Sequence, residues 1–326
     1  MWDLENMKND FSILLVLKDR PKYTKRFMNS LDGNGFPFLN ESGFPFKVLV
    51  ADGGKDTEIP KLFEQNAWPS VDIDYVRYPY DATLEDFYEK MNDAVSRIQT
   101  EFVSVMDNDD FILTEGIEKC LDVLRDSRYS SARGRIDDMA GNNMYTKFPN
   151  SITGETVLDR VIDQTKHFHG NWHNVTRTKH VQACWSMFNI IKPKNMRFTE
   201  QITGYLNVIW GDGYRGDFPW LIHDNGERIE TENGSLQNHF PDQETWINSD
   251  YWLDEFNKMT ELMGVSISCK DKIPVEEAMK EFTNTYPEKL PHLRSMLNSR
   301  LAEARSVGYN KERIETLFRT IEEFDV

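Results

Sequence analysis

Residues 84–110 read LEDFYEKMNDAVSRIQTEFVSVMDNDD and hold the clearest helix pattern of the chain, followed by a short apolar strand. The apolar side chains of 84–98 recur every three or four residues, which places them on one face of an α-helix. The run FVSVM at 102–106 is typical of a strand that is buried on both faces of a parallel sheet. This strand leads directly into Asp107, Asn108, Asp109 and Asp110.

The same alternation of strand and helix begins near the N-terminus. Apolar runs predict strands at 11–17, 46–50 and 71–77, and the spacing of Tyr23, Phe27 and Leu31 predicts a helix over 21–31. Strands that alternate with helices predict an α/β fold, with a parallel sheet covered by helices on both faces. Ligands of such folds bind beyond the carboxyl ends of the strands, where Asp52 and residues 107–110 stand.

The rest of the chain has a weaker pattern. Residues 114–125 are predicted to be helical, and 127–180 receives no detailed assignment. From about 254 to 326 the apolar spacing is helical throughout.

Composition narrows the classes of function. The 326 residues carry 38 Lys and Arg against 54 Asp and Glu, a formal charge of −16, which disfavours nucleic acid as a partner. Three cysteines without a CxxC spacing indicate a reducing compartment, so we expect a cytoplasmic protein. No apolar run approaches the roughly 18 to 20 residues of a transmembrane helix, and residues 1–10 lack the pattern of a secretory signal.

The acidic strand end admits several interpretations. Asp107 and Asp109, two residues apart, can converge on Mn²⁺ or Mg²⁺, which in turn can neutralise a diphosphate. An EF-hand loop is excluded because Ile112 stands where that loop needs glycine. A phosphatase of the haloacid-dehalogenase type, with Asp107 as nucleophile, stays open as a weaker alternative, as does a solvated acidic turn. Neither GxGxxG nor a P-loop motif is present.

Together these stretches resemble the N-terminal half of a GT-A glycosyltransferase, most closely family 2. The resemblance rests on VADGGKDTE at 50–58 and on residues 85–110, and it covers about 11 to 113 well and 181–223 loosely. It implies that Asp107, Asp109 and Asp110 form the metal site and that Asp52 binds the nucleotide. Further nucleotide-binding residues expected from it are Asp56, Arg20, Lys90, Asn92 and Asp107.

The resemblance also implies a catalytic base in the second half of the domain. The family motif E-D-x-x-x-W-L is matched imperfectly by residues 211–221, GDGYRGDFPWL, which makes Asp217 the first candidate and Asp212 the second. Because Gly216 replaces the expected Glu, the base and with it the inverting stereochemistry stay open. A loop aspartate that caps a helix is an equally strong interpretation of Asp217.

Histidine and tryptophan residues complete the expected site. His239 is the first candidate for an additional metal ligand and His223 the second, while His167, His169, His173 and His180 are expected to form a surface cluster. Trp185 and Trp220 are the candidates for the walls of the donor and acceptor pockets, although scattered tryptophans are more often core residues.

The sequence therefore predicts a GT-A domain over 1–250, with a nucleotide-sugar half at 11–113 and an acceptor half at 114–250. Residues 251–326 are predicted to be a helical extension, where a homodimer contact or a peripheral membrane contact would form. The expected reaction moves a sugar from a UDP- or GDP-sugar to a hydroxyl of a glycan or glycolipid, as in surface polysaccharide synthesis. A non-catalytic nucleotide-sugar-binding module is the alternative, ahead of the phosphatase.

Overall fold

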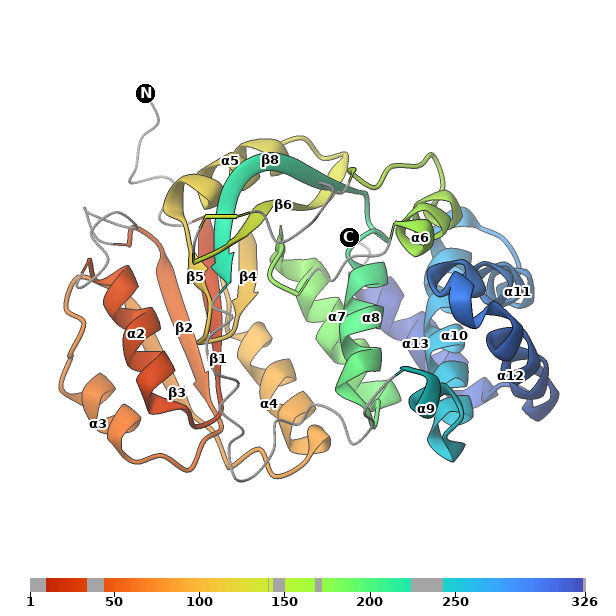
Figure 1. The fold of residues 1–326 in the computed structure, drawn as a ribbon, viewed down its shortest axis with the longest axis horizontal. Coiled ribbons are helices and arrows are strands. Elements are labelled where there is room, and N and C mark those ends of the chain that lie inside the picture. Colours follow the sequence, from red (N-terminus) through yellow and green to blue (C-terminus); the bar gives the residue numbers. More distant parts are fainter. Residues whose placement is uncertain are drawn as a thin grey trace.

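An eight-stranded mixed sheet forms the centre of the N-terminal part of the chain (Figure 1). The computed structural model describes residues 10–33, 44–139, 141–142, 150–167, 172–223 and 243–324. The strand order is β3-β2-β1-β4-β7-β6-β8-β5. The strands are β1 (Phe11–Leu17), β2 (Lys47–Asp52), β3 (Ile73–Arg77), β4 (Phe102–Met106), β5 (Phe111–Ile112), β6 (Tyr129–Asp138), β7 (Val175–Arg177) and β8 (Asp212–His223).

The first four strands are parallel, as the sequence predicts. β2 and β4 pair on either side of β1, and β3 pairs with the outer side of β2. The predicted strands at 11–17 and 102–106 are confirmed to the residue, and so is the predicted helix at 21–31. The antiparallel strands β7 and β5 make the complete sheet a mixed one.

Alternate residues of β1 point into two different cores, because successive side chains of a strand face opposite sides of the sheet. Phe11, Ile13 and Leu15 pack on one face against α2 (Pro21–Leu31), α3 (Glu58–Glu64) and α5 (Thr114–Leu124). Leu14 points to the other face, which is covered by α4 (Leu84–Ser96) and α7 (Thr178–Ile191). The predicted arrangement of helices on both faces is confirmed.

The α4 helix begins at a capping box. The Thr83 side chain accepts a hydrogen bond from the Asp86 backbone, while the Asp86 side chain accepts one from the Thr83 backbone. The buried residues Phe87, Met91, Ala94 and Val95 form the apolar stripe expected from the sequence. This helix leads the chain into β4 and so fixes where the acidic strand end emerges.

The unassigned stretch 127–180 supplies part of the sheet. It contains β6, α6 (Val157–Lys166) and β7, and β7 lies between β4 and β6 with antiparallel pairing to both. This insertion brings the residues that precede β7 beside the end of β4.

The remaining helices lie beyond α7, on the right in Figure 1. They are α8 (Met196–Leu206), α9 (Gln243–Ile247), α10 (Asp250–Asp271), α11 (Val275–Thr285), α12 (Arg294–Val307) and α13 (Lys311–Phe324), with short 3₁₀ turns at Tyr286–Lys289 and Pro291–Leu293. Their buried side chains belong to the same core cluster as those of α4 and α7. The helical character of 254–326 is confirmed within the described residues, whereas the division into domains at 250 stays a prediction.

Within the described part of the chain, no helix combines the length and the apolar character that crossing a bilayer requires.

Candidate functional site

Four parallel strands end along one edge of the sheet, and most of the predicted site residues lie there. In the register of the sheet, Leu17 pairs with Asp52 and Asp52 pairs with Arg77. On the other side of β1, Leu15 pairs with Met106, the last residue of β4. Asp52 and the residues that follow Met106 therefore face the same edge, as the topology predicts.

Asp52 is buried and makes three polar contacts at this edge. Its Oδ1 accepts a hydrogen bond from the Gly54 backbone N–H at 2.8 Å. Its Oδ2 accepts from the Tyr75 hydroxyl at 2.7 Å and pairs with the Arg77 guanidinium. Burial and the bond to Asp52 raise the pKa of the Tyr75 hydroxyl, which keeps it protonated as a donor. These partners fix the carboxylate in one orientation.

The loop after β2 is tied to the turn after β1. Asp19 Oδ1 accepts hydrogen bonds from the backbone N–H groups of Lys55, at 2.5 Å, and Asp56, at 3.0 Å. Asp56 in turn accepts from the backbone of Glu58 and Ile59 at 2.8 and 2.9 Å. The structure therefore places the predicted nucleotide-binding residue Asp56 at the start of α3, where it caps the helix.

A buried ion pair lies beneath the ends of β1 and β2. Lys90 Nζ pairs with Asp81 and also donates to the Leu17 carbonyl oxygen at 3.2 Å. Burial raises the pKa of Asp81 and lowers that of Lys90, while the charge of each partner opposes the shift of the other. A side chain at Gly53 would collide with the Asp81 carboxylate, so glycine is required there. Sequence reasoning identified Lys90 but missed Asp81, which carries no motif of its own.

Asn92 lies away from this edge. Its side-chain oxygen accepts a hydrogen bond from Ser186 of α7 at 3.3 Å. Of the two nucleotide-binding candidates on α4, Lys90 therefore lies at the strand ends and Asn92 on the side that contacts α7.

Asp109 and Asp107 differ in environment. Asp109 Oδ2 pairs with Arg20 at 2.8 Å, and the Asp109 carbonyl oxygen accepts from Arg26 at 2.8 Å. Burial raises the pKa of Asp107 to about 6, an effect that the nearby His173 opposes and the Asp109 charge reinforces. The structure thus brings Arg20, Asp107 and Asp109 together, as the sequence predicts.

Asp110 is buried between two histidines. Its Oδ1 lies 2.6 Å from His223 Nδ1, and its Oδ2 lies 3.4 Å from His173 Nε2. Because His173 Nδ1 donates to the Val105 carbonyl oxygen at 2.9 Å, the Nε2 atom is the one that faces the carboxylate. His223, the second candidate for the additional ligand, is therefore at the acidic strand end, whereas His239 lies outside the described residues.

The prediction of a surface histidine cluster is wrong for His173 and His180. His173 is mostly buried beside Asp110, and His180 is 5% exposed at the start of α7. Only His167 is well exposed, paired with Asp163 at 2.9 Å, and His169 lies outside the described residues. Sequence spacing could not show that these histidines have different surroundings. His173 precedes β7 and His180 follows it, so the strand places them at opposite edges of the sheet.

The two candidate bases lie on β8, away from the acidic cluster. Asp217 is 73% exposed and pairs with Arg135 at 2.9 Å. Asp212, at the first residue of the strand, accepts from the Gly154 backbone at 3.3 Å. Because Ile222 is the residue that pairs with Phe111, Asp217 is separated from the acidic strand end by roughly 15 Å of strand. The structure does not bring either carboxylate to the edge formed by Asp52 and Asp107.

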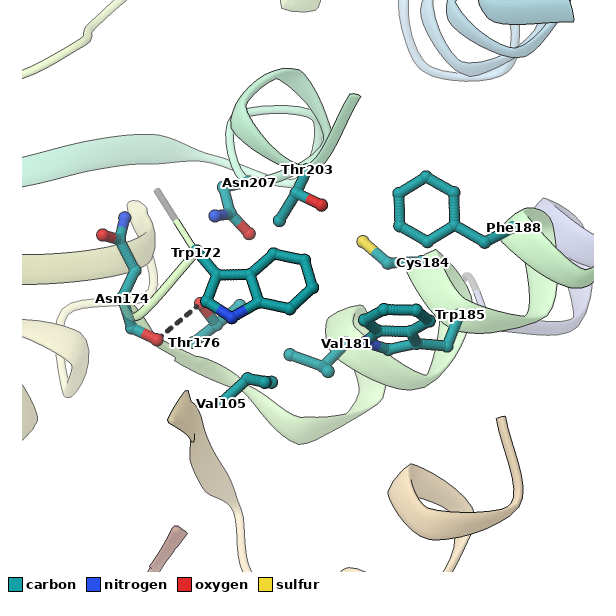
Figure 2. Close-up of a pocket in the computed structure, with 10 residues that line it drawn as sticks. All are labelled: Val105, Trp172, Asn174, Thr176, Val181, Cys184, Trp185, Phe188, Thr203 and Asn207. Carbon is teal, nitrogen blue, oxygen red and sulfur yellow. Dashed lines mark hydrogen bonds between the residues drawn. The ribbon is translucent and has the colours of Figure 1, made fainter. Parts of the chain in front are cut away.

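The two predicted pocket tryptophans are buried. Trp220 is fully buried in the core between the sheet and α5. Trp185 lines a cavity of about 20 Å³ between β4, α7 and α8, and Figure 2 shows it beside Trp172, Cys184 and Phe188. This volume holds about one water molecule. As they stand, both tryptophans are core residues rather than walls of an open sugar pocket.

The donor set at the end of β4 suits a hard divalent cation, since carboxylates with imidazole are ligands that Mn²⁺ accepts. Over the ranges that the structure describes, however, no group of three or more acidic, histidine or cysteine side chains has an arrangement that could hold a metal ion. Asp109 is occupied by Arg20 and Asp110 by His223. The residues therefore fit such a cation chemically but are not assembled around one point.

Solved structures of TarS from S. aureus are similar to this chain. The match to TarS has a TM-score of 0.54 at 15% identity and covers 96% of this chain and 55% of TarS. The match to TarS 1–349 in complex with UDP-GlcNAc has a TM-score of 0.52 at 16% identity and covers 96% and 90% of the two chains. The match to TarS 1–349 in complex with UDP has a TM-score of 0.50 at 15% identity and covers 96% of this chain and 91% of that chain.

This likeness shows that the chain has a TarS-like GT-A fold, as the sequence predicts. The chain spans about half the length of the longer TarS chain. No protein-family model matches the sequence, and no curated protein matches it either.

Proposed function

We propose that this chain is a glycosyltransferase that moves a sugar from a nucleoside-diphosphate sugar to a hydroxyl acceptor. The observation that carries the proposal is the edge where Asp52, Lys90 and the Asp107–Asp110 run meet, within a GT-A fold. A protein of the same fold has been solved in complex with UDP-GlcNAc, which supports a UDP-sugar as the first donor to test. A GDP-sugar is the second.

Each side chain at the edge has a proposed role. Asp52, held by Tyr75 and Arg77, binds the base or ribose of the nucleotide, because its fixed carboxylate can accept from those groups. Arg20 can exchange its bond to Asp109 for one to the donor diphosphate, since guanidinium groups bind phosphate oxygens well. A Mn²⁺ or Mg²⁺ ion bound by Asp107, Asp109 and Asp110, with His223 or His239, would supply positive charge beside the leaving diphosphate.

Nucleotide binding is the first test. The melting temperature should rise with UDP or GDP when Mn²⁺ is present and should not rise with EDTA, because a ligand of the folded state stabilises it. Asp109→Ala should lose the manganese-dependent part of the shift. The matched control is Asp74→Ala, which removes a half-exposed carboxylate from β3. An unchanged nucleotide response in Asp109→Ala contradicts the metal assignment.

The base is proposed from the sequence resemblance, with Asp217 first and Asp212 second. A general base must come within about 2.6 to 3.2 Å of the acceptor hydroxyl, and its loss typically costs 10²- to 10⁴-fold in rate. We expect Asp217→Asn to lose turnover with a UDP-sugar and to keep UDP binding, and Asp212→Asn to keep both. Transfer rates of the two variants are the measurement. Normal turnover in both variants would show that the base is another residue.

The position of Asp212 and Asp217 away from the edge also favours a second candidate, a nucleotide-sugar-binding module without catalysis. Such a module would give the same manganese-dependent melting shift but would neither transfer nor hydrolyse any donor. A phosphatase, in contrast, would cleave a phosphomonoester through Asp107 and show no response to the nucleotides.

The acceptor is proposed to be a glycan or a glycolipid. The helices from α10 onward remain the expected place for a homodimer or membrane contact, and a cytoplasmic location remains a prediction.

A further inference from the structure

A second groove lies at the opposite edge of the sheet, where β4 begins. Its volume is about 1,060 Å³, slightly above the roughly 300 to 1,000 Å³ that is typical of small-molecule sites. It is bounded by residues 98–101 before β4, the end of α5, the first turn of α7, Trp210, and Lys270 near the end of α10. The length of β4, roughly 16 Å, separates it from the acidic strand end.

The charge of this groove is opposite to that of the protein. Its described lining residues include four basic side chains, and Glu101 is the acidic one among them. Glu101 pairs with Arg177 at 2.7 Å and Arg125 pairs with Asp122 at 2.5 Å, so the positive charge of the groove comes from Lys179 and Lys270. The chain as a whole carries a formal charge of −16, so a concentration of positive charge here is unexpected from composition. The basic residues are Arg125, Arg177, Lys179 and Lys270.

The floor of the groove contains buried polar atoms without a hydrogen-bond partner. Thr178 Oγ1, His180 Nδ1 and Trp210 Nε1 are all in this state. Thr178 is 6% exposed and His180 5% exposed, and both line the groove. A buried polar group without a partner is destabilising, so such groups in a native protein call for an explanation such as a bound ligand. The threonine hydroxyl and the indole N–H are donors, which need an acceptor.

The backbone adds donors at the same point. Helix α7 begins at Thr178 and runs for 14 residues, and Arg177 at its N-cap provides no side-chain cap. The Thr178 N–H already donates to the Glu101 carbonyl oxygen at 2.8 Å. The N–H groups that follow it in the first turn, with the partial positive charge of the helix end, are the ones that can face an anion.

His180 reports the local potential independently. Its ring stacks on the Trp210 ring, with the two centroids 4.7 Å apart. Burial, together with the positive charges of Lys179, Arg177 and Lys270, lowers the pKa of His180 to about 3. Three cations from two separate helices and β7 therefore act on one buried point.

We propose that this groove binds an oxyanion, specifically the phosphate group of a phosphate ester. Thr178, the first turn of α7 and the Trp210 indole would donate to the phosphate oxygens, and Lys179 and Lys270 would balance its charge. The phosphate could belong to a soluble ester or to a lipid headgroup, since both present the same oxygens. This site is separate from the nucleotide edge and does not depend on the proposed transferase activity.

The first test is a titration with inorganic phosphate at constant ionic strength, with EDTA present and chloride as the reference anion. The wild-type protein should show a saturable rise in melting temperature. Lys179→Gln combined with Lys270→Gln should weaken the apparent affinity at least tenfold. The control pair is Lys61→Gln with Lys280→Gln, which removes the same charge from exposed positions and should behave as wild type.

Thr178→Val separates binding from folding. The change removes an unpartnered buried hydroxyl at nearly constant volume, so the ligand-free melting temperature should be equal or higher. The phosphate response should nevertheless be weaker than in wild type. A wild-type protein without a saturable shift, or a lysine pair variant with the wild-type response, overturns the proposal.

Sedimentation with vesicles identifies the source of the phosphate. Binding to phosphatidylcholine vesicles that contain phosphatidylglycerol, lost in the Lys179 and Lys270 pair variant, assigns a lipid headgroup. A phosphate-dependent shift without vesicle binding assigns a soluble ester. Equal binding of wild type and pair variant in both assays contradicts the site. The response to UDP with Mn²⁺ should be unchanged in the groove variants, so failure of the groove and failure of the transferase proposal are distinguishable.

Discussion

Asp52 and Asp93 show how the same residue type gains different roles from its surroundings. Each carboxylate accepts a hydrogen bond from a tyrosine and pairs with an arginine: Tyr75 and Arg77 for Asp52, and Tyr78 and Arg97 for Asp93. Asp52 is buried at the strand end, whereas the Asp93 side chain is 45% exposed on α4. Of the two carboxylates, Asp52 is the one that is held in a fixed orientation at the end of β2, where the candidate site lies.

We therefore expect Asp52→Asn to weaken UDP binding in the presence of Mn²⁺ by about tenfold or more. The physical reason is that a charged acceptor contributes about 1.5 to 3 kcal/mol to a hydrogen bond, which an amide does not match. Isothermal titration calorimetry measures the change. Asp93→Asn is the matched control and should bind as wild type does. Equal losses in both variants would mean that Asp52 acts only through folding.

At the scale of elements, the turn after β1 and the β7–α7 unit organise the two ends of the sheet. Asp19 and Arg20 adopt left-handed conformations, with φ of 58° and 62°, which residues other than glycine seldom do. In this turn, Asp19 accepts a hydrogen bond from the loop after β2 and Arg20 pairs with Asp109. The β7–α7 unit carries His173 to the acidic strand end and His180 to the basic groove.

The buried His180 predicts a pH-dependent stability. Its pKa is about 3 in the folded protein against the ordinary histidine value of 6.5, so the unfolded chain binds more protons between these values. Stability is therefore lost as the pH falls below 6.5. We expect His180→Phe, which keeps a ring against Trp210, to gain about 1.4 kcal/mol relative to wild type for each pH unit below 6.5.

Urea unfolding at pH 7.5 and pH 5, in buffers without phosphate, measures this difference. His167→Gln changes a well-exposed histidine and serves as the control, with no comparable gain. A free-energy difference between His180→Phe and wild type that stays constant with pH would contradict the prediction.

At the scale of the whole molecule, one core cluster joins the sheet to the C-terminal helices. It extends from Leu14 of β1 through α4 and α7 to Leu317 and Ile321 of α13. Helix α13 packs directly on α7, the same helix whose first turn borders the basic groove. The C-terminal helices therefore support the elements that carry both candidate sites.

Leu317→Ala tests this coupling. Truncating a fully buried leucine typically costs 2 to 5 kcal/mol, and the shared core predicts that the loss lowers the melting temperature of the whole chain. Far-UV circular dichroism and tryptophan fluorescence should report the same shifted transition. Glu315→Ala, at an exposed position of the same helix, should leave it unchanged. A separate early transition that precedes unfolding of the sheet would instead support an independent unit at 251–326.

The sequence by itself determined the elements whose signals are local. The helix at 84–98, the buried runs at 11–17 and 102–106, and the acidic residues at strand ends are read from periodicity and burial within a few residues. Because parallel strands end at one edge, these local signals also placed Asp52 with Asp107 and Asp109. The resemblance to GT-A glycosyltransferases rests on the same stretches, and the fold agrees with it.

The tertiary structure alone decided which residues from distant parts of the chain meet. The insertion of β7 between β4 and β6 set His173 against Asp110, and the pairing of β5 with β8 did the same for His223. Neither contact can be read from the spacing of residues in the sequence. Strand order depends on how whole elements pack, and not on the residues next to one another in the chain. The ion pair of Asp81 with Lys90 could not be read from the sequence either. Nor could the basic groove, because its lining residues lie far apart in the sequence and come together only in the folded chain.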